Sequence, residues 1–240
     1  MSAVNVGQGS AGVSEFRGQV TLDGPSGTGK SSVARDVAAR LGAAYLDTGA
    51  MYRAATVAVL DAGVDLTDTD AVTRAVASAD IQVGTAADAE LVLVDGVDVA
   101  ARIRGAEVTR TVSPVSAVPA VRRMLVERQR ALVAEADGVV VEGRDIGTVV
   151  LPEATLKVYL TAAPEARAQR RAGQLGVVDP ARIAEIAADL RRRDEYDSSR
   201  ADSPLRPAVD AVVVDSTGLD RDAVVERVLD LARTAVGEPA

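Results

Sequence analysis

The chain has 240 residues, of which 27 are basic and 35 acidic, and it contains no cysteine, histidine or tryptophan. These absences exclude disulfides, zinc–thiolate sites, thiol nucleophiles and imidazole bases or ligands. The net charge of -8 argues against a general nucleic-acid surface, because such surfaces need clustered lysine and arginine. Any catalysis must therefore use carboxylates, arginine, lysine, hydroxyl groups, backbone amides or a bound hard cation.

The composition is that of a globular protein, with 48% hydrophobic residues. The length suits one α/β domain with an insertion, or two small domains. No apolar run is long enough to span a membrane, and residues 1–19 lack the basic and apolar regions of a signal peptide. We therefore expect a cytoplasmic protein with no membrane partner. Its basic residues are almost all arginine, and Lys30 and Lys157 are its two lysines.

The first elements in chain order form a strand, a turn and a helix. Residues 1–17 lack any periodic pattern and are predicted to be a loose tail. A buried strand is predicted at Gln19–Asp23, followed by a glycine-rich turn and a helix at about Lys30–Leu41 with apolar residues at four-residue spacing. A second strand at Ala43–Leu46 then leads into a helix near Thr48, and Asp47 or Thr48 is its expected N-cap.

Residues 62–105 differ in texture from what precedes them, because small polar residues and glycine dominate. Two alternating stretches, Glu90–Val94 and Val97–Ile103, flank the dipeptide Asp95-Gly96, which favours a hairpin turn. We predict an inserted helix followed by a small antiparallel sheet.

The strand and helix pattern then resumes and continues to the end of the chain. The predicted helices are Val118–Glu135, Pro164–Gln174, Pro180–Arg193 and one beginning at Asp220, with an arginine-rich loop after Arg193. The predicted strands are Gly138–Val141, Leu156–Leu160 and Ala211–Val214. Alternation of strands and helices predicts a parallel sheet covered on both faces.

A glycine-rich motif lies between the first predicted strand and helix and fits the pattern GxxxxGK[ST]. Its residues are Gly24, Pro25, Ser26, Gly27, Thr28, Gly29, Lys30 and Ser31. In this context the backbone amides and the helix N-terminus form an anion site, the lysine reaches the β- and γ-phosphates, and Ser31 can bind Mg²⁺. An ordinary glycine-rich turn that caps a helix is the alternative. The preceding strand and the rarity of lysine favour a nucleotide phosphate loop.

Nucleotide binding alone leaves several protein classes open. A GTPase would need an Asn-Lys-x-Asp element to read guanine, and the one asparagine of the chain is Asn5, in the predicted tail. A motor or regulatory ATPase would use an apolar strand that ends in aspartate, plus a glutamate base for water, and Gly138–Asp145 resembles such a strand. An ATP-dependent regulatory or interaction protein therefore stays open as a different class.

Polar residues that suit a second phosphate follow two of the predicted strands. Asp47, Thr48 and Arg53 lie at the start of a helix, and Arg144 and Asp145 follow the strand at 138–141. Ligands of open α/β sheets gather at the carboxyl ends of the strands. A capped helix with a solvated arginine is the alternative explanation for the first group.

Positive charge is enriched in residues 165–206, which hold nine arginines against eight acidic residues. Arg167 and Arg171 are four residues apart on a predicted helix, where like charges repel unless an anion lies between them. The spacing hints at a phosphate partner. For any one of these arginines, a solvated charged face is the competing explanation.

Four motifs in order now resemble those of the bacterial cytidylate kinase family. They are TLDGPSGTGKS at Thr21–Ser31, LDTGAMYR at Leu46–Arg53, EGRDIGTVVLPEA at Glu142–Ala154 and RRDEYDSSRADSPLRPA at Arg192–Ala208. The resemblance covers about residues 19–236. The N-terminal tail departs from the family pattern, and Thr28 stands where other members often have alanine.

The resemblance implies a P-loop kinase fold, in which a doubly wound parallel five-stranded sheet carries a small inserted antiparallel domain and a helical lid. The core would comprise residues 18–61 and 106–240, with the lid at about 164–180, and residues 62–105 would form the inserted monophosphate-binding domain. The implied reaction is ATP + CMP ⇌ ADP + CDP, with dCMP also accepted and Mg²⁺ as cofactor. We expect a monomer with ATP and CMP or dCMP as its small-molecule substrates and no nucleic-acid partner.

The resemblance also assigns roles by matching position. Lys30 and the lid residues Arg167, Arg170 and Arg171 would stabilise the transferred phosphoryl group. The cytosine would be contacted by Ser113, Arg122 and Asp145, and the ribose by Arg193 and Asp197. The CMP phosphate would be held by Arg53, Arg144 and Arg200, with Asp47 and Thr48 at its border. Another small-molecule or nucleotide kinase of the same fold is the nearest alternative.

Overall fold

A five-stranded parallel sheet forms the centre of the molecule in the computed structural model, which describes residues 16–200 and 202–237. Its strand order is β2-β6-β1-β7-β8. The strands are β1 (Gly18–Asp23), β2 (Ala44–Asp47), β6 (Gly138–Glu142), β7 (Leu156–Thr161) and β8 (Val212–Asp215). The two strands of greatest functional interest pair directly, with Leu22 of β1 opposite Glu142 of β6.

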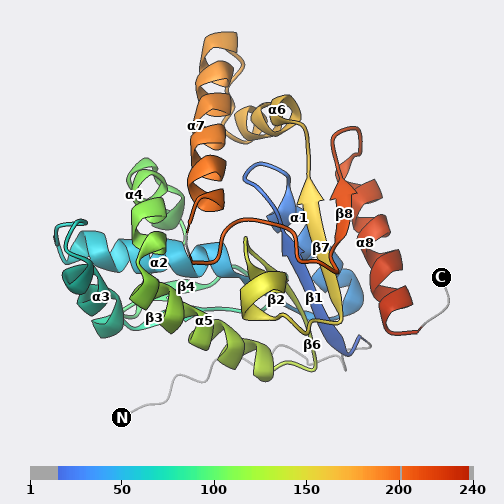
Figure 1. The fold of residues 1–240 in the computed structure, drawn as a ribbon, viewed down its shortest axis with the longest axis horizontal. Helices are drawn as coiled ribbons and strands as arrows, with labels where there is room; N and C mark the ends of the chain where they lie inside the picture. The colour runs from blue at the N-terminus through green and yellow to red at the C-terminus, as the bar shows by residue number, and fades with distance from the viewer. Residues whose placement is uncertain (1–15, 201, 238–240) are drawn as a thin grey trace.

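Both faces of this sheet are buried, which explains its nearly continuous apolar strands. Val20, Leu22 and Val140 face a core cluster shared with helices α1 (Lys30–Leu41) and α8 (Arg221–Ala235). Val139 and Val141 face the opposite cluster, which includes α5 (Pro119–Ala134) and a π-helical turn at Ile146–Val150. Figure 1 shows α8 beside β8 at one side of the sheet.

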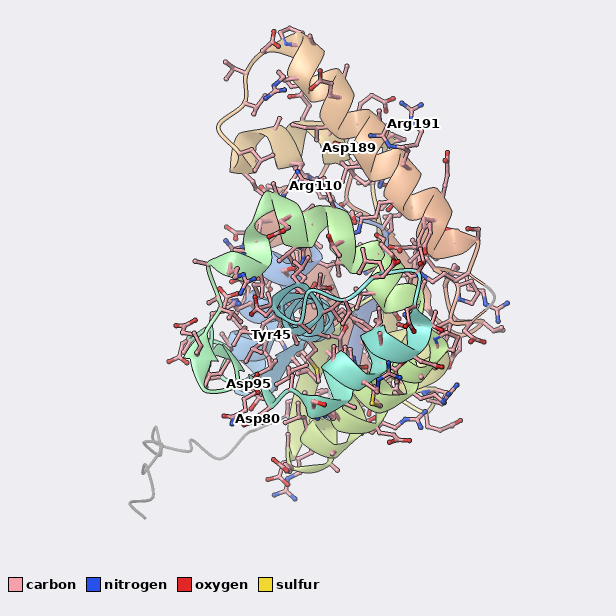
Figure 2. The ribbon with its side chains drawn as sticks, turned by 90° about the vertical axis from the view of Figure 1, so that its left-hand side faces the viewer. Tyr45, Asp80, Asp95, Arg110, Asp189 and Arg191 are labelled. Carbon is pink, nitrogen blue, oxygen red and sulfur yellow. The ribbon has the colours of Figure 1, made fainter. Side chains whose placement is uncertain are left out.

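A second, three-stranded antiparallel sheet lies within residues 62–105 and has the order β3-β4-β5. Its strands are β3 (Ile81–Val83), β4 (Val92–Val94) and β5 (Val97–Asp98). It packs with α2 (Thr48–Asp61), α3 (Thr69–Ser78), a 3₁₀ turn at Arg102–Arg104 and α4 (Ala106–Ala117). The Asp95 carboxylate accepts a hydrogen bond from the backbone N–H of Asp80 at 2.8 Å, so the hairpin turn is tied to the start of β3 (Figure 2).

Helices α6 (Pro164–Gln174) and α7 (Pro180–Ser198) pack against each other above the carboxyl ends of β7 and β8, toward which the strand arrows point (Figure 1). Helix α4 approaches α7 from the other side, and Figure 2 shows Arg110 of α4 below Asp189 and Arg191 of α7. Segments distant in sequence thus meet over the edge of the sheet where the glycine-rich loop lies.

The structure departs from the sequence predictions in three places. Helix α7 continues to Ser198, so the predicted arginine-rich loop after Arg193 is wrong for its first five residues. Helix α4 and strand β3 were not predicted, because Pro114 and several β-branched residues weaken the local helix signal of α4 and β3 has three residues. The predicted second hairpin strand is shortened to β5 because the 3₁₀ turn follows it.

Phe16 was placed in the predicted tail, yet it is buried in the core cluster of α1 and α8, because an aromatic ring beside β1 gains from leaving water. Residues 1–15 of that tail lie outside the described residues. Among the residues that are described, no helix has the length and apolar character needed to cross a membrane.

Candidate functional site

The glycine-rich loop joins β1 to α1 at the carboxyl edge of the parallel sheet, as its sequence context predicted. Gly24, Gly27 and Gly29 all have positive φ values, of 144°, 81° and 91°. A side chain at Gly24 would place its Cβ 2.0 Å from the carbonyl oxygen of Leu160 in β7. The first glycine is therefore required by the close approach of two backbones, and the third by the left-handed N-cap of α1.

Lys30 is buried under this loop, with 5% of its surface exposed. Its ammonium group donates to the carbonyl oxygen of Pro25 at 2.6 Å and to the Thr28 hydroxyl at 3.4 Å. Burial, followed by the charge of Arg144, lowers the pKa of Lys30 well below its usual value, and the carboxylates of Glu142 and Asp23 oppose this shift. A phosphate at the loop would raise the pKa of Lys30 again, because a nearby anion favours the charged ammonium form.

The predicted lid arginines reach the same loop from α6. Arg167 donates to the carbonyl oxygen of Ser26 at 3.1 Å and forms an ion pair with Asp194 of α7. Arg170 donates to the carbonyl oxygen of Thr28 at 3.2 Å and to the hydroxyl of Ser216 at 2.9 Å. The repulsion expected between Arg167 and Arg171 is thus reduced by Asp194, which pairs with Arg167. Arg171 donates to the side-chain oxygen of Gln174 at 3.1 Å.

A second set of arginines, the arginine group, comprises Arg53, Arg144, Arg193 and Arg200, and the charges of the other three act on Arg193. Arg144 links the two regions, because it donates to the Ser26 hydroxyl at 2.8 Å and to the Asp197 carboxylate at 3.3 Å. Arg200 pairs with the same carboxylate. Arg53 donates to the carbonyl oxygen of Ile103 at 2.9 Å and to the Thr109 hydroxyl at 3.1 Å.

These arginines perturb one another. Burial, then the charges of Arg144 and Arg53, lowers the pKa of Arg193 to about 9. Burial, then the charge of Arg122, lowers the pKa of Arg200 to about 10. Burial also lowers the pKa of Arg53, with nearby Asp47 opposing the shift and the charge of Arg171 adding to it. Such a concentration of cationic groups out of water is the environment of an anion-binding site.

A buried ion pair of Arg122 and Asp145 lies beside this arginine group, and both side chains are about 5% exposed. Arg122 also donates to the carbonyl oxygen of Ser116 at 3.2 Å, and its guanidinium lies 5.2 Å from the ring centre of Tyr52. Ser113 lies on α4 one turn before Ser116 and is half-buried. Arg122 and Asp145, which the resemblance predicts to contact the cytosine, are therefore brought together.

Several polar atoms in this region have no hydrogen-bond partner in the described part of the chain. They include the buried Nε atoms of four arginines, Arg122, Arg167, Arg193 and Arg200. Buried donors are nearly always paired in folded proteins, so unpaired ones that gather at one edge of a sheet point to a ligand.

Asp47 and Thr48 have structural partners at the start of α2. The Asp47 carboxylate accepts from the backbone N–H of Ala50 at 2.9 Å and is the N-cap of the helix. The Thr48 hydroxyl donates to the carbonyl oxygen of Glu142 at 2.7 Å. Burial raises the pKa of Asp47, and Arg53 opposes this shift.

Three further carboxylates lie in the site and received no role from the sequence. Asp194 of α7 accepts from the backbone N–H of Ser26 at 3.1 Å. Glu142 accepts from the Tyr45 hydroxyl at 2.6 Å, and burial raises its pKa to about 7. Asp23 is buried at the end of β1. Glu142 belongs to the strand pattern that kept an ATPase open, whereas the partners of the other two carboxylates are distant in sequence.

Comparisons with known proteins agree with the motif set. A family model described as cytidylate kinase matches residues 20–234. The cytidylate kinase of Rhodococcus opacus (strain B4) is 57% identical over 222 residues, which cover 91% of this chain and 97% of that protein. The cytidylate kinase of Nocardia farcinica (strain IFM 10152) is 57% identical over 210 residues, covering 86% and 90% of the two chains.

Among solved structures, a gluconokinase from Sinorhizobium meliloti 1021 aligns with a TM-score of 0.50 and 19% identity, covering 92% of this chain and 95% of that one. This likeness concerns the fold alone. It confirms the expected P-loop kinase architecture, a parallel five-stranded sheet with helices on both faces.

The close approach of Gly24 to β7 generates a first prediction. Gly24→Ala should lose more than about 4 kcal/mol of unfolding free energy, because the new methyl group cannot avoid the Leu160 carbonyl oxygen. Gly29→Ala is the matched control, since nothing lies within 4 Å of its added Cβ and only backbone strain of about 1–2 kcal/mol is expected. Urea unfolding followed by circular dichroism measures both. Equal stability of the two variants would contradict the backbone contact.

Proposed function

The chain belongs to the cytidylate kinase family, whose members phosphorylate CMP and dCMP, and we propose that it does so by in-line transfer between the glycine-rich loop and the buried arginine group. The observation that carries this proposal is the position of Arg144. Its guanidinium contacts Ser26 of the loop and also Asp197, the carboxylate that pairs with Arg200, so two proposed anion sites adjoin. Adjoining anion sites suit an enzyme that moves a phosphoryl group between two nucleotides.

On the donor side, the backbone N–H groups of residues 24–31, except that of Pro25, which has none, would hold the ATP phosphates, with Lys30 beneath them. Arg167, Arg170 and Arg171 come from α6, which contacts this loop through two of the three side chains. Charge that develops on the transferred phosphoryl group would be stabilised by these cationic groups in a site with little water.

The residues present also fit Mg²⁺, which prefers oxygen ligands and is usually held by one or two side chains together with substrate phosphates. The Ser31 hydroxyl is exposed at the start of α1, and it forms a hydrogen bond with Glu142 that lowers the pKa of that carboxyl. Ser31 would hold the ion, with Glu142 beside it. When bound, Mg²⁺ neutralises charge on the β- and γ-phosphates.

On the acceptor side, Arg53, Arg144 and Arg200 would hold the CMP phosphate, and Asp47 and Thr48 would border it. The pKa values of Arg53 and Arg200 support this assignment, because both are lowered by burial first and by neighbouring guanidinium groups as well, and a bound dianion would oppose both effects. Arg193 and Asp197 on α7 would contact the ribose.

The buried Arg122–Asp145 pair, with Ser113 nearby on α4, would read the cytosine. The cytosine N4 amino group donates, whereas N3 and O2 accept, so a carboxylate and a guanidinium complement that edge of the base. Uracil would instead place a carbonyl oxygen next to the carboxylate.

The chemistry needs no histidine. A phosphomonoester has a second pKa near about 6, so the acceptor is already largely dianionic at neutral pH and requires no general base. The reaction then depends on alignment, charge neutralisation and exclusion of water. The division into core, inserted domain and lid remains a prediction, as do the monomeric state, the cytoplasmic location and the absence of nucleic-acid or membrane partners.

An acceptor panel tests the proposed function. With ATP and Mg²⁺, a coupled assay of ADP formation should give far higher kcat/KM for CMP and dCMP than for UMP, AMP or shikimate. Preference for another acceptor would favour a different kinase of this fold. ADP formation without a phosphorylated acceptor would favour the ATP-dependent regulatory class.

Lys30→Ala should lower kcat by at least about a hundredfold, because the ammonium group at the phosphates is lost. The circular dichroism spectrum and the melting temperature of the variant should stay close to those of the wild type. Near-normal turnover would contradict the assignment of the phosphate loop.

Arg53→Ala should raise the KM for CMP by about tenfold or more while the KM for ATP changes less than about twofold, because a charge-assisted contact to the acceptor phosphate is lost. Arg102→Ala is the control, since Arg102 is exposed and pairs with Asp61 outside the site. Initial rates with each substrate varied in turn separate the two constants. An equal rise in both would contradict the acceptor role of Arg53.

A further inference from the structure

Asp23, the last residue of β1, joins two loops that approach from different parts of the chain. Its two carboxylate oxygens accept hydrogen bonds from the backbone N–H groups of Ile146 at 2.9 Å and Gly147 at 2.8 Å. The next residue along the chain is Gly24, the first of the phosphate loop. Ile146 and Gly147 directly follow Arg144 and Asp145, the two side chains assigned to CMP.

The Asp23 contacts begin where the regular pairing of β1 with β6 ends. The backbone N–H of Gly143 still donates to the carbonyl oxygen of Leu22 at 3.0 Å. Beyond this point the two backbones diverge, one into the phosphate loop and the other into the π-helical turn. The Asp23 carboxylate therefore replaces a ladder of backbone hydrogen bonds with a side-chain link between the two diverging segments.

The loop that Asp23 holds has little freedom to adopt another position. A Cβ at Gly143 would lie 2.6 Å from the Ile146 side chain, and one at Gly147 would lie 3.1 Å from the Thr21 hydroxyl. The backbone N–H groups of Val149 and Val150 both donate to the carbonyl oxygen of Asp145, which closes the following turn. The orientation of Arg144 and Asp145 thus depends on how the N-terminal end of this turn is anchored.

Keeping a carboxylate at this place is unfavourable on its own. Asp23 is 5% exposed, and burial raises its pKa to about 6, with the nearby charge of Asp145 adding to the shift and the two N–H donors and Lys30 opposing it. Tyr159 of β7 lies opposite Asp23 in the sheet, and the charge of Asp23 adds to the burial that raises the pKa of the Tyr159 hydroxyl. A buried acid beside a second acid needs a compensating contribution, and the two amide hydrogen bonds from the loop supply it.

We propose that Asp23 is a positioning residue that fixes the CMP-binding loop against the phosphate loop, so that acceptor and donor are aligned by one carboxylate. The inference rests on the proposed function in its assignment of Arg144 and Asp145 to CMP. Both oxygens of Asp23 are engaged by backbone N–H groups of the loop, so its role is to position the loop. Its removal should disturb the acceptor side more than the donor side, because it holds the backbone that follows Arg144 and Asp145.

The proposal also gives a direction for pH dependence. A protonated Asp23 presents one oxygen as an O–H group to the loop amides, so it can no longer accept both N–H groups well. The CMP loop should therefore loosen as the pH falls through about 6. The phosphate of CMP titrates in the same range, but its contribution cancels when the wild type and Asp23→Asn are compared at each pH.

The test uses Asp23→Asn in the full chain, with Thr21→Val as the matched control. Thr21 lies on the same strand, is fully buried against Gly147, and its hydroxyl has no hydrogen-bond partner among the described residues. In Asp23→Asn the amide NH₂ group would face one of the two N–H donors. We expect the KM for CMP at pH 8 to rise by about fivefold or more in Asp23→Asn, with the KM for ATP within about twofold. Thr21→Val should resemble the wild type in both constants.

A second measurement does not depend on activity. In ¹⁵N–¹H spectra of the wild type, the amide signals of Ile146 and Gly147 should titrate with a midpoint near pH 6, and this titration should be absent in Asp23→Asn. If Asp23→Asn kept wild-type constants, or raised both KM values equally, the positioning role would be overturned. A wild type that phosphorylates no cytidine nucleotide would instead overturn the proposed function, and the amide titration would still report on the Asp23 contacts.

Discussion

The site depends on buried arginines whose positive charge is balanced by carboxylates of the same chain. Three ion pairs do this, between Arg122 and Asp145, Arg167 and Asp194, and Arg200 and Asp197. A buried guanidinium group without a partner is costly, and each of these three arginines is paired with one acid. Each anchored arginine nevertheless keeps a buried Nε atom with no partner among the described residues. The acids thus orient the arginines while leaving donors available for substrate.

Local concentration of charge reconciles this site with an acidic protein. The net charge of -8 describes the whole chain, whereas the arginines of the site come from α2, α5, α6 and α7 and from the segments that follow β6 and α7. The electrostatic potential at a partly buried site is set mainly by the nearest charges, because distant surface charges are screened by water. A protein with a net negative charge can therefore still hold a local site for small anions.

The sequence predicted the position of those site residues that lie in one continuous stretch with the strand they follow. The phosphate loop, the Asp47 cap and Arg144 with Asp145 each follow a strand, so their position at the sheet edge could be predicted from one stretch of sequence. Asp194 and Asp23 could not be assigned in this way, because the backbone amides they accept from are 168 and 123 residues away along the chain. Helix α4 was missed for a related reason. Its apolar residues pack on α2 and α5, and this tertiary contact overrides a weak local propensity.

Asp194 contacts two donors of the proposed phosphate site. Its carboxylate accepts from the N–H of Ser26 in the phosphate loop and pairs with Arg167, two donors that lie where nucleotide phosphates are proposed to bind. A phosphate bound by these donors would compete with the Asp194 carboxylate for them, so the free energy gained on binding would be the difference between the two sets of contacts. Exchange of this kind limits how tightly a nucleotide is held, which suits an enzyme that must release its products in every cycle.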